Sequence, residues 1–123
     1  MASISDYVLD AALSKLDLEA NRLDITSQEV TTYNEAISTF TLGNTTSVSF
    51  AAPVNGDVSG RKTTCAAVTD GSVTGNGTAT HYAVTDTTNS RLLCTGSLST
   101  SQSVVSGNTF TISAFDVEIP DPA

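Results

Sequence analysis

The second half of the chain alternates short runs rich in Thr, Val and Ala with turns that contain glycine. This pattern is typical of the short strands of a β-sandwich or barrel. The runs expected to form strands span residues 61–69, 80–86, 90–98 and 109–119, and the connections expected between them lie at residues 70–71, 75–77, 87–89 and 106–108. We expect the second and third runs to form a hairpin, because only Thr87, Thr88 and Asn89 separate them.

The last run changes its hydrophobic register once. Apolar residues occupy the even positions from Phe110 to Ala114 and the odd positions from Phe115 to Ile119. Side chains alternate between the two faces of a strand, so a slip of one residue indicates a bulge or bend. We expect the chain to pass from one sheet to the other at this point.

The N-terminal part of the chain has a different periodicity. Residues 5–18 carry leucine at positions i, i+4 and i+7, which predicts one short amphipathic helix. The three leucines are Leu9, Leu13 and Leu16. Ser3 or Ser5 can cap this helix, and Asp6 suits its first turn. Because a helix of this length is marginal alone, it is expected to lie on the β-domain or to dock onto a neighbouring subunit.

The segment that follows predicts a strand, a loop and two further strands. Residues 22–27 alternate, which places Leu23 and Ile25 inward and Asp24 and Thr26 outward. Residues 28–36 are polar and lack periodicity, so they predict a surface loop anchored by Tyr33.

Strands are expected again at residues 38–42 and 47–52, with a tight turn at Gly43 and Asn44 between them. Residues 53–60 contain a proline, two glycines and an Asn-Gly pair, and they predict a loop.

These elements predict an all-β fold: an antiparallel β-sandwich, jelly-roll or immunoglobulin-like, with one short N-terminal α-helix. The length of 123 residues suits a single domain, 1–123. Within it we expect an arm of helix, strand and loop over residues 1–36 and the sandwich over residues 37–123. Aromatic residues make up 6% of the chain and Trp is absent, so the core is expected to be thin.

The charge, the apolar pattern and the cysteines argue against several classes of protein. A net charge of -8 disfavours nucleic acid as a partner, because binding to phosphates depends on Lys and Arg. The N-terminus lacks the pattern of a secretory signal, and no segment has the roughly 18 apolar residues of a membrane helix. Cys65 and Cys94 lie in predicted strands, and free buried thiols are a simpler expectation for them than a disulfide.

No pattern of residues predicts an active site, a metal site or a cofactor site. His81 is the single histidine, and a structural position in a strand is favoured over a catalytic one. The acidic residues lack the dense alternation of a calcium loop, although a cation at a subunit contact stays open. Asp57, Asp70 and Asp86 are expected to stabilise turns, and Asp116 and Glu118 to face solvent on the last strand.

The order of strand and turn residues resembles that of a family. Residues 80–119, THYAVTDTTNSRLLCTGSLSTSQSVVSGNTFTISAFDVEI, resemble a pattern of small structural proteins of tailed bacteriophages. That pattern has a strand with Thr-His, an aliphatic pair before Thr-Gly-Ser-Leu, and a Val-Ser-Gly entry into a last strand that begins Thr-Phe. RLDITSQE at residues 22–29 and TTYNEA at residues 31–36 are similar to the opening of the same family.

The resemblance implies a virion component without enzymatic activity, most simply a capsid decoration, or cement, protein. Such a protein would be made in the host cytoplasm and would lie on the outer capsid surface. Its partners would be the major capsid protein and copies of itself, with no nucleic acid, membrane or cofactor. From the acidic and partly apolar N-terminal segment we select Tyr7, Leu18 and Tyr33 as candidate contact residues.

Two other functions stay open. A tail or head-fibre module would bind a glycan or protein of the host surface. A small hydrolase would use His81, and its activity would be lost in His81→Ala.

Overall fold

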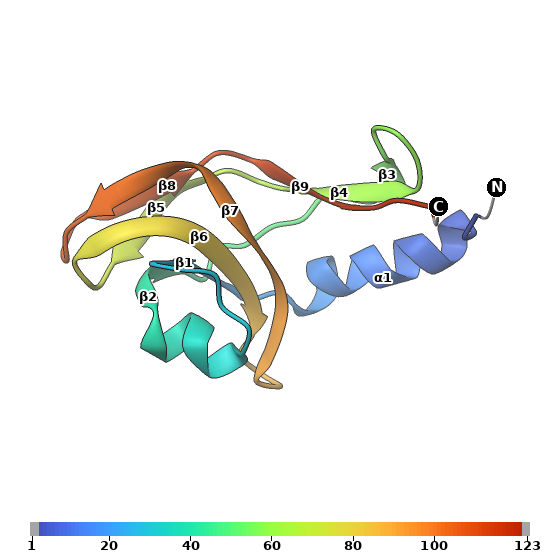
Figure 1. The fold of residues 1–123 in the computed structure, drawn as a ribbon. Coiled ribbons are helices and arrows are strands. Elements are labelled where there is room, and N and C mark those ends of the chain that lie inside the picture. The colour runs from blue at the N-terminus through green and yellow to red at the C-terminus, as the bar shows by residue number, and fades with distance from the viewer. Residues whose placement is uncertain (1–2, 122–123) are drawn as a thin grey trace.

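The computed structural model of the chain describes residues 3–121. In that range the chain forms one α-helix, a five-residue π-helical turn and nine β-strands (Figure 1). In chain order they are α1 (Asp6–Glu19), β1 (Arg22–Thr26), η1 (Glu35–Thr39), β2 (Thr41–Thr45), β3 (Val54–Asn55), β4 (Arg61–Cys65), β5 (Val68–Val73), β6 (Gly77–Asp86), β7 (Arg91–Val104), β8 (Thr109–Ile112) and β9 (Phe115–Ile119).

The strands form two antiparallel sheets. The larger sheet has the order β7-β6-β1-β2-β5-β8 and is strongly curled, and the smaller sheet has the order β3-β4-β9 (Figure 1). This arrangement confirms the prediction of an all-β, sandwich-like fold with a short N-terminal helix. Strand β1, which belongs to the arm predicted over residues 1–36, lies inside the larger sheet between β6 and β2.

One hydrophobic core joins both sheets and the helix. Its buried members come from α1, from seven of the strands and from the chain near residue 50, and they are Leu13, Leu16, Leu23, Ile25, Leu42, Phe50, Cys65, Val68, Val73, Ala79, Tyr82, Val84, Val104, Phe110 and Ile112. Leu23 and Ile25 are fully buried there, as their alternation predicts. Phe115 packs between the sheets, with its ring centroid 4.2 Å from that of Tyr82.

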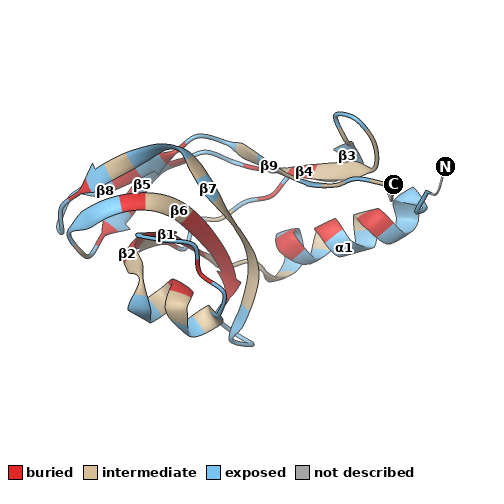
Figure 2. Cartoon of the chain, viewed as in Figure 1, coloured by how far each residue is buried: buried red, intermediate tan, exposed pale blue. Residues whose placement is uncertain are grey.

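Helix α1 forms where the leucine spacing predicts it. The Oγ atom of Ser5 accepts a hydrogen bond from the backbone N–H of Val8 at 3.4 Å and caps the helix. The three leucines of the predicted stripe are buried, and the helix packs against β4. Figure 2 shows buried positions on the side of α1 that faces β4 and exposed positions on the opposite side. The helix therefore lies on the β-domain, one of the two positions expected for it.

The slip of register in the last run separates two strands. Strand β8 pairs with β5 in the larger sheet, and β9 pairs with β4 in the smaller one. The chain leaves one sheet at Ser113 and enters the other at Phe115. The predicted passage between sheets is confirmed.

The predicted hairpin is also confirmed, and its strands are longer than expected. Strands β6 and β7 pair from Asp86 and Arg91 at the turn to Gly77 and Val104 at the far end. Asp86 is buried at the turn, where its carboxylate accepts hydrogen bonds from the backbone N–H of Thr88 and the side-chain amide of Asn89.

Two predicted turns at glycine are wrong, because both glycines lie inside strands, and Asp70, expected to stabilise one of these turns, lies in β5 beside Gly71. Gly71 is in β5 opposite Phe110, and a Cβ atom there would stand 2.2 Å from the Phe110 ring. Gly43 is in β2, where a Cβ atom would stand 2.5 Å from the carbonyl oxygen of Ser72. These glycines allow close packing within the sheet. The run predicted at residues 61–69 is accordingly split into β4 and β5.

The loop predicted over residues 28–36 and the strand predicted over 38–42 are also partly wrong. A helical turn begins at Tyr33 and continues into η1, and β2 begins only at Thr41. This segment covers the face of the larger sheet opposite the main core, where Val30 and Ala36 pack against Ala83.

The cover explains a further correction on β1. Asp24 and Thr26 were expected to point outward, yet neither is exposed to solvent. Asp24 is instead paired with Arg22, whose Nε and Nη2 donate to its carboxylate at 2.7 and 2.9 Å. The hydroxyl of Thr41 donates a third hydrogen bond at 2.6 Å.

Residues 47–60 differ from the prediction in detail. The strand expected over 47–52 is reduced to a single bridge between Phe50 and Cys65. The loop expected over 53–60 contains the short strand β3, which pairs with the start of β4.

Candidate partner-binding surfaces

The outward side of α1 carries two of the three candidate contact residues. Tyr7 is 85% exposed and Leu18 is 77% exposed. They are eleven residues apart, which is close to three helical turns, so they lie on one stripe with the exposed Ala11. We call Tyr7, Ala11 and Leu18 the outer stripe of α1. Ser14 and Lys15 lie between Ala11 and Leu18 on this side of α1, so the helix has one covered leucine stripe and an exposed outer side with separate apolar side chains.

A network of polar contacts holds this helix on the smaller sheet. Arg61 of β4 donates from Nε and Nη2 to the carboxylate of Asp10 at 2.7 and 3.2 Å. Its Nη1 donates to Oδ1 of Asn55 at 2.8 Å, which ties the β3 strand to the same group. The hydrogen bond to Asp10 is the main cause that raises the pKa of Arg61. The outer stripe is thus presented by a helix with a fixed position.

Further apolar side chains are exposed at the end of the molecule where α1 begins. Figure 1 shows the start of α1 and the β3 strand at the same end of the fold. Besides Tyr7, the large exposed apolar residues in or next to these two segments are Ile4, Val8, Val54 and Val58. Exposed apolar side chains that gather in one region mark sites of interaction more often than isolated ones do.

Tyr33, the third candidate, lies elsewhere. It is half-buried in the helical turn before η1, on the larger sheet, whereas α1 lies along the smaller sheet (Figure 1). The pKa of Arg22 is raised mainly by its hydrogen bond to Asp24, and Tyr33 adds to this effect. The structure therefore brings Tyr7 and Leu18 together and separates Tyr33 from them.

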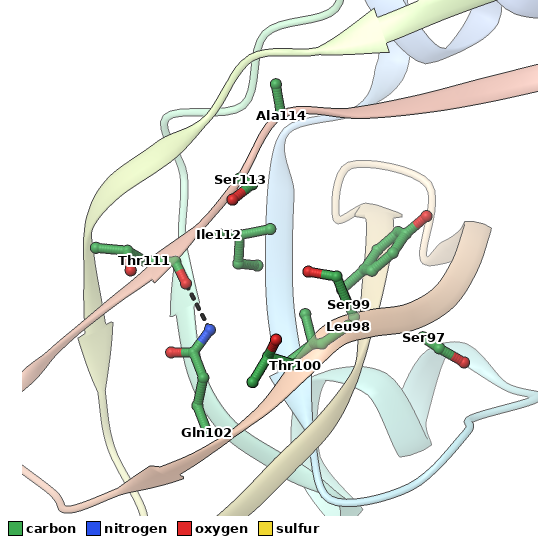
Figure 3. A pocket seen from close by; sticks show the side chains of 10 residues that line it. Ser97, Leu98, Ser99, Thr100, Gln102, Thr111, Ile112, Ser113 and Ala114 are labelled. Atoms are coloured by element: carbon green, nitrogen blue, oxygen red, sulfur yellow. Dashed lines mark hydrogen bonds between the residues drawn. The ribbon is translucent and has the colours of Figure 1, made fainter.

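A second candidate surface is a small pocket of about 210 Å³ between the two edge strands of the curled sheet (Figure 3). Its lining is Ser97, Leu98, Ser99, Thr100 and Gln102 from β7, Thr111 and Ile112 from β8, Ser113 and Ala114 beyond it, and Tyr82 from β6. None of these described residues is charged. We call this gap the β7–β8 seam. The sequence did not indicate it, because it depends on how far the sheet curls.

His81 and several of the acidic residues have structural partners. His81 is half-buried on β6, and its Nδ1 lies 2.8 Å from the Thr80 hydroxyl. Lys62 pairs with Asp57 at 2.6 Å and with Asp116 at 3.1 Å. Among residues 3–121, no three His, Cys, Asp or Glu side chains are grouped so that they could hold a metal ion.

Both cysteines are free thiols in the structure. Burial raises the pKa of Cys65 to about 11 and that of Cys94 to about 12. A thiolate is the reactive form of cysteine, so burial makes both side chains poor nucleophiles at neutral pH. Both side chains therefore act in packing. The free thiols agree with the prediction that favoured them over a disulfide.

Comparisons with protein-family models, with curated proteins and with solved structures find no match to this chain. Over residues 3–121, none of its helices combines the length and the apolar content needed to cross a membrane.

Proposed function

We propose that this chain is a structural protein of a tailed-bacteriophage virion that binds the outside of the head as a decoration protein. The observation that carries the proposal is the outer stripe of α1, because it places Tyr7 and Leu18 in solvent on a firmly held helix. The family resemblance of residues 80–119 supports the assignment to a virion.

The physical basis of such a role is the burial of apolar surface across joints of the shell. A fully buried Leu or aromatic side chain contributes about 1.5 to 3 kcal/mol relative to an exposed one. Each copy would add a few such contacts to the major capsid protein or to a neighbouring copy, and the many copies on a shell would add together. The net charge of -8 and the hydroxyl-rich strands suit the solvent-facing side.

The test is reassembly of the full chain onto heads produced without it. Tyr7→Ser and Leu18→Ser are each expected to weaken binding to these heads about tenfold, because each removes one large apolar contact. Val105→Ser is the matched control, since Val105 is also an exposed apolar residue but lies in the turn after β7. It is expected to bind as the parent chain does.

The same heads allow a test of the mechanical role. Heads that carry the chain are expected to rupture at a higher temperature than bare heads. The proposal would be contradicted if decorated and bare heads ruptured at the same temperature. It would also be contradicted if Tyr7→Ser and Leu18→Ser bound the heads as tightly as Val105→Ser. Binding of the chain to tails or to host cells instead of heads would favour the tail or fibre module.

A further inference from the structure

The β7–β8 seam is an opening between two strands that are consecutive in the chain. A tight turn joins them, in which the backbone N–H of Asn108 donates to the carbonyl of Val105 at 3.1 Å. Among the described residues β7 pairs only with β6, and β8 pairs only with β5, so the two strands are the opposite edges of one curled sheet. Each edge presents backbone N–H and C=O groups that lack a neighbouring strand.

One side chain spans the opening. Nε2 of Gln102 on β7 donates to the backbone carbonyl of Thr111 on β8 at 2.6 Å (Figure 3). The carboxamide of glutamine has the same donor and acceptor groups as a peptide bond. Gln102 therefore makes the hydrogen bond that the peptide group of an additional strand would make with β8.

The edge of β7 is open near the same place. Gln102 of β7 pairs with Ala79 of β6, and Ser97 of β7 pairs with His81. Residues 98–101 of β7 therefore lie opposite a single residue of β6 and form a bulge. A bulge leaves backbone groups outside the ladder. Residues of β7 and β8 line the two sides of the pocket.

The size and chemistry of the pocket favour an extended peptide over a compact ligand. Its volume of about 210 Å³ is below the roughly 300 Å³ at which small-molecule sites begin. Its lining is formed by hydroxyls, aliphatic groups, one amide and Tyr82, without charge. It suits one or two small uncharged side chains of a segment that is held mainly through its backbone.

We propose that the β7–β8 seam binds an extended, uncharged segment of a partner polypeptide by β-strand addition. The segment displaces the carboxamide of Gln102, hydrogen-bonds to the edge of β8 at Thr111 and places its side chains in the pocket beside residues 98–101 of β7. This mode of recognition uses backbone hydrogen bonds for affinity and a pocket for side-chain preference. It does not depend on the assignment of the chain to a virion.

The first experiment selects ligands from a displayed library of random uncharged peptides of about six residues, the commonest strand length. The full chain is the target, and the selected peptides are then measured against two variants at one position. In a strand the N–H and C=O of one residue point to the same side, so the N–H of Thr111 faces the seam with its carbonyl. Thr111→Pro removes this donor without removing a bond to β5, and Thr111→Val keeps it.

We expect Thr111→Pro to bind about tenfold more weakly than Thr111→Val, which corresponds to the loss of one backbone hydrogen bond. Hydrogen exchange of the parent chain gives an independent measurement if the proline variant does not fold. The amide of Thr111 is expected to exchange more slowly when the peptide is bound.

The second experiment uses the competing side chain. Gln102→Ala is expected to tighten peptide binding about threefold, because it frees the carbonyl of Thr111. A small polar ligand held by the Gln102 amide would show the opposite change.

Three results would overturn the proposal. They are failure to enrich any peptide on either the parent chain or Gln102→Ala, unchanged binding of the selected peptides to a folded Thr111→Pro, and protection of amides away from β7 and β8.

Discussion

At the scale of single residues, the main departure from the sequence pattern is Asp24. Its position in the alternation of residues 22–27 indicates a solvent-facing carboxylate, and the structure buries it completely. The helical turn and η1 cover this face of β1. Their sequence has no hydrophobic periodicity, so the sequence does not predict that they pack on the sheet. A buried carboxylate requires a compensating partner, and Arg22 provides it from the same strand.

Removal of Arg22 tests this account. Arg22→Met is expected to lower the free energy of unfolding by about 3 kcal/mol, because Asp24 is left buried without its partner. The double variant Arg22→Met, Asp24→Leu is expected to be more stable than Arg22→Met alone, since no uncompensated charge remains. Urea denaturation at pH 7 measures both. If Arg22→Met were as stable as the parent chain, the ion pair with Arg22 would not be required to compensate the buried carboxylate of Asp24.

A second prediction at this scale concerns pH. Hydrogen bonds from Asn89 and from the backbone of Asn89 and Thr88 lower the pKa of Asp86 below its ordinary value of 3.8. A carboxylate whose pKa is lower in the folded chain than in the unfolded chain contributes its full stabilisation at pH values above its unfolded pKa. This contribution is lost as the pH falls through its folded pKa. The melting temperature is therefore expected to be steady above about pH 5 and to fall below pH 4.

Asp86→Ala gives the matched measurement. Its melting temperature is expected to lie below that of the parent chain at pH 7, and the difference is expected to shrink as the pH falls below 3.8. A constant difference from pH 7 to pH 2.5 would contradict the role of the charge at the hairpin turn.

At the scale of elements, helix α1 combines a structural face with an exposed one. Its leucine stripe could be predicted from the sequence, because the spacing of Leu9, Leu13 and Leu16 fits a single helical face. The sequence also indicates Tyr7 and Leu18 as contact residues, but only the structure shows that both are exposed on one side of the helix. Tyr33, the third residue that the sequence indicates, lies on another part of the fold.

The two faces are expected to respond differently to the same substitution. Leu13→Ala is expected to lower the free energy of unfolding by about 2 to 5 kcal/mol, because it opens a cavity in the core. Leu18→Ala is expected to change it by less than about 0.5 kcal/mol, because the side chain lies in solvent. Denaturation of both variants in urea measures this contrast. A large loss of stability in Leu18→Ala would show that Leu18 packs within the chain and is not free for a partner.

At the scale of the whole molecule, the strand pattern predicted the fold class, the hairpin of β6 and β7 and the crossing between sheets at residues 113–115. It failed at Gly43 and Gly71, because a glycine needed for close packing in a sheet has the same appearance in sequence as a turn glycine. It also could not predict the curl of the larger sheet. The β7–β8 seam results from that curl and from the bulge in β7, which depend on contacts between distant residues.

We propose that the chain binds the phage head through the outer stripe of α1, and a density map of the intact particle would locate it. Density for this fold is expected on the outer surface of the head, with Tyr7 and Leu18 against the capsid protein or a neighbouring copy. Particles that lack the chain, or that carry it with the outer stripe facing solvent, would rule out this binding mode.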